Sequence, residues 1–365
     1  FLNTVTIQAT PFGLPSSLVL SVLVGVGISD TLHRVIRAVR VRQGIKRAVG
    51  AGLCLIPLVP LLTHYGLCDQ SRNYTGYEHA VNILRTPEEG SVVFLDADNN
   101  IFPVVYVRIV EKKGEHLYLY DRHNMILKPP FLPYLGRPGK RVSGTWEDIR
   151  SRMEKAIIQE PSLPGVYYAL FDPSNIALPP DHFLMPYGIL YKVGDRLDGR
   201  KGYRVEDLWP FYSSEAVHTR FYRDFLTRQV AGHDLFRRGQ YLILGGYRPL
   251  GMARIRTASS VSRDDAVLHL LMADFLARQK LFPEARHELK LAEQYHKDPA
   301  HIQNNWGNYY FQKGEYPKAE DAFQTAVDLA PGKAAYHKNL GLCLLRQGKD
   351  EEALQAFQES LKQDQ

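Results

Sequence analysis

The stretch AHIQNNWGNYYFQKGEYPKAEDAFQTAVDLAP, Ala300–Pro331, decides the fold of the last third of the chain. It contains a turn at Lys313–Tyr316, and Pro331 closes the unit. Similar residues recur 34 positions before and after it. The recurring positions hold a small residue at Ala273, Gly307 and Gly341, a second small residue at Ala285, Ala319 and Ala353, and a large apolar residue at Leu289, Phe323 and Phe357.

A 34-residue period of this kind is typical of the tetratricopeptide repeat. Small residues recur because the two helices of a unit touch there, and large apolar residues fill the space between successive helix pairs. The sequence therefore predicts three repeats within residues 251–365, which form an all-α solenoid. Such an array either offers a concave groove to a peptide or a neighbouring domain, or only braces the domain before it. The sequence leaves both alternatives open.

The chain has 365 residues, enough for two or three domains, and carries 45 Lys+Arg against 39 Asp+Glu. The whole excess lies in one loop, residues 33–47, which contains no acid. Its cations are Arg34, Arg37, Arg40, Arg42, Lys46 and Arg47. Because the rest of the chain is balanced in charge, its basic character gives no reason to expect a nucleic-acid partner.

An uncharged run flanks this loop on each side, residues 12–28 and, if His64 is neutral, residues 48–67. Each run is close to the length that crosses the hydrocarbon core of a bilayer. Residues 1–68 are therefore expected to form a transmembrane helical hairpin with membrane lipid as a partner, and the positive-inside rule places the loop in the cytoplasm. The later domains would then be extracytoplasmic parts of an inner-membrane protein. The alternatives are two buried helices of a soluble protein and, for the first run, a signal peptide.

Residues 69–250 are predicted to form a small α/β domain with a helical extension. Strands are expected at 91–95, 116–121, 165–171 and 187–193, and helices at 75–86, at 101–114 and from Thr145 onward. Thr145 and Asp148 have the spacing of a capping box. Because a strand, a helix and a strand in this order form a parallel crossover, the sheet is expected to be mostly parallel.

The stretch SVVFLDADNNIFP, Ser91–Pro103, places Asp96, Asp98 and Asn99 where the first strand gives way to a helix. Ligands favour this end of a strand in open α/β sheets. However, Asp98 or Asn99 also suits a helix N-cap, and Asp96 and Asp98 would point to opposite faces of a continuing strand. The capping interpretation is therefore favoured over a catalytic one.

Other signatures of chemistry are missing from the sequence. It has no P-loop, no zinc-protease motif, no nucleophile elbow and no dinucleotide fingerprint after a strand. Its three cysteines stand at unrelated spacings, so they predict neither a disulfide framework nor a metal site. No cofactor is expected in this segment.

The order of these features resembles the C-terminal half of the multi-spanning membrane glycosyltransferases that include a eukaryotic protein O-mannosyltransferase. The resemblance rests on the two apolar runs, then DQSRNYTGYEHAVNIL, VVFLDADNNIFPVVYVRIV and GVYYALFDPSNIALPPDHFLMPYGILYKV, with tetratricopeptide repeats last. Members of that family typically carry Gly-Asp-Asn-Asp-Thr-Phe-Pro where this chain has ADNNIFP, Ala97–Pro103. Ala97, Asn100 and Ile101 depart from the pattern.

The resemblance implies an enzyme that transfers a sugar from a lipid-phosphate carrier to a protein or glycan acceptor outside the cytoplasm. In that class the catalytic acid sits in an outer loop near the N-terminus, a region expected upstream of Phe1. This segment would then position the acceptor and be inactive alone, so no catalytic residue is named. The alternative function is a non-enzymatic membrane-anchored scaffold whose tetratricopeptide groove binds other proteins.

Overall fold

The computed structural model describes Arg34, Gly44 and residues 71–123, 126–127, 145–173, 176–195, 208–213 and 224–363. The expected membrane hairpin, residues 1–68, lies outside these ranges apart from Arg34 and Gly44, so the positions expected for Arg37, Arg40, Arg42, Lys46 and Arg47 stay predictions. In the part of the chain that is described, no helix combines the length and the apolar character needed to cross a bilayer. The chain divides into two compact units, and the second, Tyr74–Thr219 with Leu226–Gln365, holds nearly all of the elements below.

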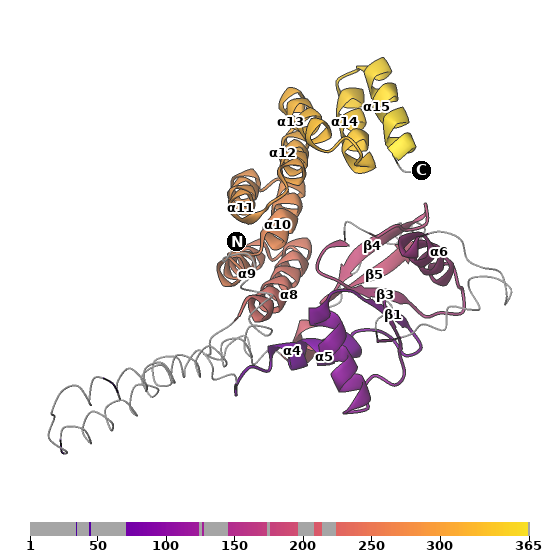
Figure 1. The fold of residues 1–365 in the computed structure, drawn as a ribbon, viewed down its shortest axis with the longest axis vertical. Helices are drawn as coiled ribbons and strands as arrows, with labels where there is room; N and C mark the ends of the chain where they lie inside the picture. Colours follow the sequence, from indigo (N-terminus) through magenta and orange to yellow (C-terminus); the bar gives the residue numbers. More distant parts are fainter. Residues whose placement is uncertain are drawn as a thin grey trace. The chain divides into compact units, whose positions relative to one another are not determined.

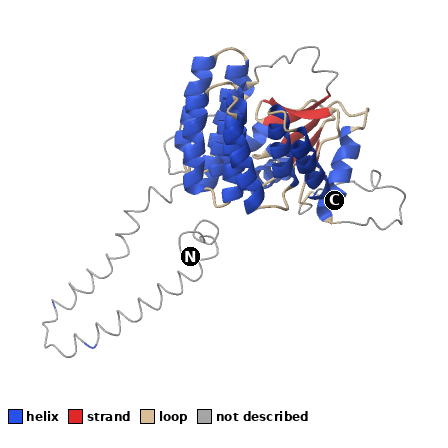
Figure 2. Cartoon of the chain, turned by 90° about the horizontal axis from the view of Figure 1, so that it is seen from above, coloured by secondary structure: helices blue, strands red, loops and turns tan. Residues whose placement is uncertain are grey.

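All strands in the described ranges belong to one five-stranded sheet with the order β2-β1-β3-β5-β4 (Figure 2). They are β1 (Val92–Leu95), β2 (Tyr118–Asp121), β3 (Val166–Ala169), β4 (His182–Tyr187) and β5 (Leu190–Asp195). Strand β1 runs parallel to both of its neighbours, with Val92 opposite Tyr118 of β2 and Val166 of β3. The carboxyl ends of these three strands therefore meet at one edge of the sheet.

The expectation of a mostly parallel sheet is wrong, because β5 pairs antiparallel with both β3 and β4. A two-residue turn at Gly188–Ile189 joins β4 to β5, where the sequence had suggested a single strand. Gly188 adopts a φ of 58°, which a two-residue hairpin of this kind requires at its first central position. The sheet is thus mixed, with a parallel half and an antiparallel half.

Helices cover both faces of the sheet (Figure 1). On one face, Val93 and Leu95 of β1 pack with α4 (Thr75–Arg85) and α5 (Asp98–Ile109). On the other face, Val92 and Phe94 pack with α6 (Trp146–Ile158). This alternation follows from the two-residue period of a strand. The predicted capping box at the start of α6 is confirmed, because Thr145 and Asp148 bond each other's main chain.

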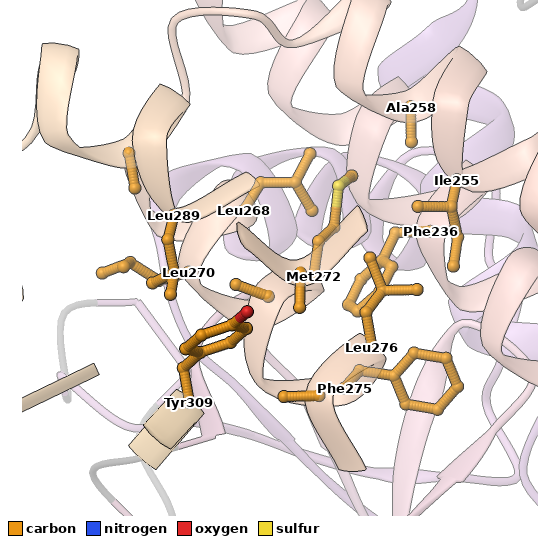
Figure 3. Close-up of a cluster of buried hydrophobic side chains, with 14 of the residues drawn as sticks. Phe236, Ile255, Ala258, Leu268, Leu270, Met272, Phe275, Leu276, Leu289 and Tyr309 are labelled. Carbon is orange, nitrogen blue, oxygen red and sulfur yellow. The ribbon is translucent and has the colours of Figure 1, made fainter. Parts of the chain in front are cut away.

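After the short helix η3 (Trp209–Phe211), the rest of the described chain is helical. The helices are α8 (Phe225–Leu244), α9 (Arg248–Val261), α10 (Ala266–Arg278), α11 (Phe282–Tyr295), α12 (Pro299–Lys313), α13 (Tyr316–Leu329), α14 (Ala334–Arg346) and α15 (Asp350–Gln363). Figure 3 shows Phe236 of α8 and Ile255 of α9 in the same cluster as Leu268 and Met272 of α10. The pair α8 and α9 therefore continues the hydrophobic core of the repeats, and the domain boundary expected at residue 250 falls within α9.

Glycines allow the two helices of a repeat to approach closely. A Cβ atom added at Gly307 would lie 2.5 Å from the ring of Phe323, and one at Gly341 would lie 2.8 Å from the ring of Phe357. Phe323 is 1% exposed, so its ring has little room to move away. The small residues of the other repeated positions, Ala273, Ala285, Ala319 and Ala353, are also buried. The sequence period thus corresponds to close contacts between helices.

We expect Gly307→Ala to destabilise the solenoid by about 1–3 kcal/mol, because the new methyl group overlaps the Phe323 ring in a filled core. The matched control is Gly332→Ala, where the nearest atom to an added Cβ lies 3.9 Å away. Urea unfolding of both variants measures the difference. Equal stability of the two variants would contradict the proposed helix contact.

Candidate functional site

Asp96 follows β1 at the carboxyl edge of the sheet, but its carboxylate is fully engaged. Its Oδ1 accepts hydrogen bonds from the Ala97 main-chain nitrogen at 2.8 Å and from His123 Nε2 at 2.7 Å. Its Oδ2 forms an ion pair with Arg122, which follows β2. Asp96 therefore joins the ends of two parallel strands.

Arg122 is buried between two carboxylates, with only 3% of its side chain exposed. Its Nε donates to Glu154 Oε1 of α6 at 2.7 Å, and the Tyr168 hydroxyl donates to Glu154 Oε2 at 3.2 Å. Burial acts to raise the pKa of Asp96, but the Arg122 charge and the His123 hydrogen bond outweigh it and lower that pKa. Asp96 thus stays ionised and paired with Arg122, which suits a structural role better than a free catalytic base.

The expected capping role of Asp98 and Asn99 is wrong. The N-cap of α5 is Ala97, and no side chain caps this helix end. Asp98 takes the first helical position and is exposed. Its negative charge there interacts favourably with the positive end of the helix dipole. The Asn99 amide instead donates to Gln229 Oε1 of α8 at 2.9 Å. The helix also starts three residues before the predicted position, so Pro103 lies beyond its first turn.

A second set of hydrogen bonds joins helices α4, α5 and α8 to the carboxyl ends of β1 and β3. His79 of α4 lies between Asp234 of α8, with Nδ1 and Oδ2 3.0 Å apart, and Asn100 of α5, with Nε2 and Oδ1 2.7 Å apart. The Asn100 amide nitrogen donates to the carbonyl oxygens of Asp96 at 2.7 Å and Ala169 at 3.2 Å. One imidazole thus connects α4 and α8 with the ends of β1 and β3.

The partners of His79 require it to be positively charged. Because the Asn100 nitrogen donates to two main-chain carbonyls, its Oδ1 must face His79 as an acceptor. Asp234 presents a carboxylate to the other ring nitrogen, so both nitrogens must carry a proton. Burial acts to lower the pKa of His79, but Asp234 and Asn100 outweigh it and raise that pKa. The imidazolium is therefore the form that fits.

No sequence pattern indicates this arrangement. His79 and Asp234 are 155 residues apart in the chain. Asn100 drew attention only because it differs from the residue that the glycosyltransferase motif has at that position. Within the described ranges, no three His, Cys, Asp or Glu side chains converge to hold a metal ion.

A more open site lies against the repeats. A hollow of about 300 Å³ is bordered by α10 and α12, and the loop that follows β3 contributes Asp172 and Pro173. The α10 side is largely apolar, and the α12 side carries amides. The lining residues that matter below are Val267, Leu270 and Leu271 from α10, and His301, Asn304, Asn305 and Asn308 from α12. The groove therefore exists, and the preceding domain forms part of its border.

The amides of α12 retain unused hydrogen-bonding capacity. Asn304 Oδ1 accepts from Asn339 Nδ2 of α14 at 2.8 Å, which leaves the Asn304 NH2 group. Asn305 Nδ2 donates to the His301 carbonyl at 2.9 Å, which leaves the Asn305 oxygen. No hydrogen bond joins the Asn308 side chain to another described residue. Since an asparagine offers two donors and an acceptor, this wall can bind further polar groups.

Ala97 sits in a backbone conformation that a side chain rarely adopts, with φ 70° and ψ 145°. We expect Ala97→Gly to raise the free energy of unfolding by about 1 kcal/mol, because glycine accepts this conformation without strain. The control is Ala156→Gly within α6, which should destabilise by about 1 kcal/mol. Chemical denaturation measures both, and a loss of stability in the Ala97 variant would contradict the strain.

The raised pKa of His79 sets the sign of a pH dependence. Its contribution to stability is complete below its unfolded pKa of about 6.5 and is lost as pH rises through the higher folded pKa. His79→Gln should therefore cost more stability at pH 6 than at pH 9. Each unit of upward shift corresponds to about 1.4 kcal/mol. Urea unfolding at both pH values measures the difference.

The control for this prediction is His116→Gln, which changes an exposed histidine. It should show little difference in stability between the two pH values. A His79 variant that loses equal stability at pH 6 and pH 9 would contradict the buried imidazolium.

Comparison with known proteins concerns the repeats. A family model for the tetratricopeptide repeat matches residues 304–365. Similar solved structures include a crystal structure of MamA (18% identity, 36% of this chain, 78% of that chain, TM-score 0.30). They also include MamA 41-end from Desulfovibrio magneticus RS-1 (20% identity, 36% of this chain, 75% of that chain, TM-score 0.30). No curated protein matches the chain. These comparisons add no support for the glycosyltransferase family, and the family match identifies residues 304–365 as tetratricopeptide repeats.

Proposed function

We propose that this chain is a protein-interaction scaffold whose solenoid binds an extended peptide in the groove between α10 and α12. The observation that carries the proposal is the row of asparagines, Asn304, Asn305 and Asn308, on one wall of an open hollow. The tetratricopeptide match over residues 304–365 supports it, because such arrays use their concave faces for binding.

The groove chemistry favours an extended main chain. A peptide backbone alternates N–H donors and C=O acceptors, and each asparagine side chain offers both complementary groups. Val267 and Leu271, which are partly exposed on the α10 side, provide a surface for an apolar side chain of the peptide. His301 also lines the hollow, and burial together with His296 lowers its pKa, so it adds no positive charge at neutral pH.

Helix α14 of the next repeat would favour a negatively charged residue in the bound peptide. Lys338 lies 34 residues after Asn304, at the equivalent position of α14, and its side chain is exposed. The corresponding position of α10 is Leu270. Along the array the same position thus changes from apolar to amide to cationic. A matching peptide would carry an apolar residue near α10 and an acidic residue near α14.

The resemblance to membrane glycosyltransferases gives a finer form of this proposal. In that form the bound peptide would be the acceptor of a sugar transferred elsewhere in a longer protein. Its support is the motif Ala97–Pro103, which lies at the carboxyl edge of the sheet, the edge whose β3 loop borders the groove. Removing the repeats from a longer form would then impair acceptor use more than donor turnover.

The test is a selection of peptides from a random library displayed on phage, with the full chain as the target. Peptides selected on the native chain should bind Asn308→Arg at least about tenfold more weakly, because the larger cation fills the groove and removes an amide contact. Isothermal titration with the synthetic peptide measures the change in Kd.

The matched control is Gln324→Arg on α13, an exposed position with the same change in charge and size. This variant should bind as tightly as the native chain. Equal loss in both variants, or peptides that bind with no dependence on position 308, would contradict the groove as the binding site.

A further inference from the structure

Helix α5 has an apolar face that no described part of the chain covers. Phe102, Tyr106, Ile109 and Val110 are 51%, 53%, 63% and 61% exposed, respectively. Their spacing places them together along one side of the helix, and we name them the outer stripe. The opposite side of α5 is also apolar, because Ile101, Val104 and Val107 are buried against the sheet. A helix that is apolar on both sides usually has a second partner.

Helix α6 provides an internal comparison, since it covers the other face of the same sheet. It buries Met153 and Ile157, as α5 buries its inner residues. Its exposed side, however, carries Glu147, Asp148 and Arg152. The two helices occupy equivalent layers, and only α5 exposes an apolar side. The outer stripe therefore does not follow from the fold alone.

The position of α5 in the chain indicates what covers it. Residues 48–67 form an uncharged run that is long enough to cross a bilayer, and only residues 68–74 separate it from α4. Seven residues reach at most about 25 Å. Helix α4 packs directly on α5 within one hydrophobic cluster. If the run spans a bilayer as its sequence predicts, α4 and α5 are held close to the membrane surface.

We infer that the outer stripe of α5 docks on the surface of a lipid bilayer. The stripe combines two aromatic rings with two branched aliphatic chains, the composition favoured at the boundary between head groups and acyl chains. Lys112 is exposed just beyond its C-terminal end, where its charge can reach anionic head groups. This contact is separate from the peptide groove, so it would orient the α/β domain on the membrane whether or not a peptide is bound.

The experiment measures the depth of the stripe in the membrane with the full chain. Tyr106→Trp is reconstituted into phosphatidylcholine–phosphatidylglycerol vesicles with or without bromine on the acyl chains, and the native chain supplies the background of its other tryptophans. The expected result is loss of Trp emission at position 106 in brominated vesicles. The control is Leu354→Trp on α15, equally exposed in the structure at 58%, which should lose none.

A second variant distinguishes insertion of the outer stripe into the membrane from a position of α5 that is only near the membrane. Tyr106→Trp combined with Ile109→Glu places a charge in the stripe and should abolish the quenching while the chain stays on the vesicles. Three results would overturn the inference: no association of the chain with vesicles, equal quenching at positions 106 and 354, or a blue-shifted Trp at position 106 without bromine quenching. The last result would mean that a protein surface, from this chain or a second copy, covers the stripe.

Discussion

The buried contact between His79 and Asp234 is the constraint on which the described structure depends most. It joins α4 of the α/β domain to α8, the first helix of the solenoid, and through Asn100 it also holds the ends of β1 and β3. Breaking a buried ion pair by removing one partner typically costs about 3–5 kcal/mol, because a charge is left without compensation. The imidazolium and its acceptors therefore help to fix the relation between the sheet and the groove, together with the hydrogen bond from Arg237 of α8 to the Leu170 carbonyl. The loop after β3, which borders the groove, starts from a strand end that this chain of bonds holds.

A second network, which shares Asp96 with the first, stabilises the same edge of the sheet. Asp96, Arg122 and Glu154 link β1, β2 and α6. Ligands often bind at such an edge in open α/β sheets, yet here the charged groups neutralise one another. On α12 of the solenoid, by contrast, the side chains of Asn304, Asn305 and Asn308 keep polar groups that face an open hollow. The charged groups at the sheet edge are paired with one another, whereas the asparagines of α12 can still bind a ligand. For this reason we place the binding function in the groove.

The parts of the fold that depend on short-range pattern could be predicted from the sequence. The 34-residue period anticipated the contact between Gly307 and Phe323, and the spacing of Thr145 and Asp148 anticipated a capping box. Among contacts far apart in the chain, the parallel pairing of β1 and β2 could be predicted, but others could not. The antiparallel half of the sheet depends on a turn at Gly188 inside what looked like one apolar run, and the His79–Asp234 contact joins residues far apart in the chain. The start of α5 was predicted three residues too late. Its N-cap is Ala97, whose backbone has a conformation that alanine seldom adopts.

The central claim is that the concave surface of α10 and α12 is the binding surface of this protein. Hydrogen–deuterium exchange of the full chain, with and without a saturating peptide selected on it, tests this claim most directly. The account predicts slower amide exchange in α10 and α12, with α11 and α13 unchanged because they lie on the other side of each repeat. Protection confined to α11 and α13, or to the α/β domain away from the loop after β3, would contradict it.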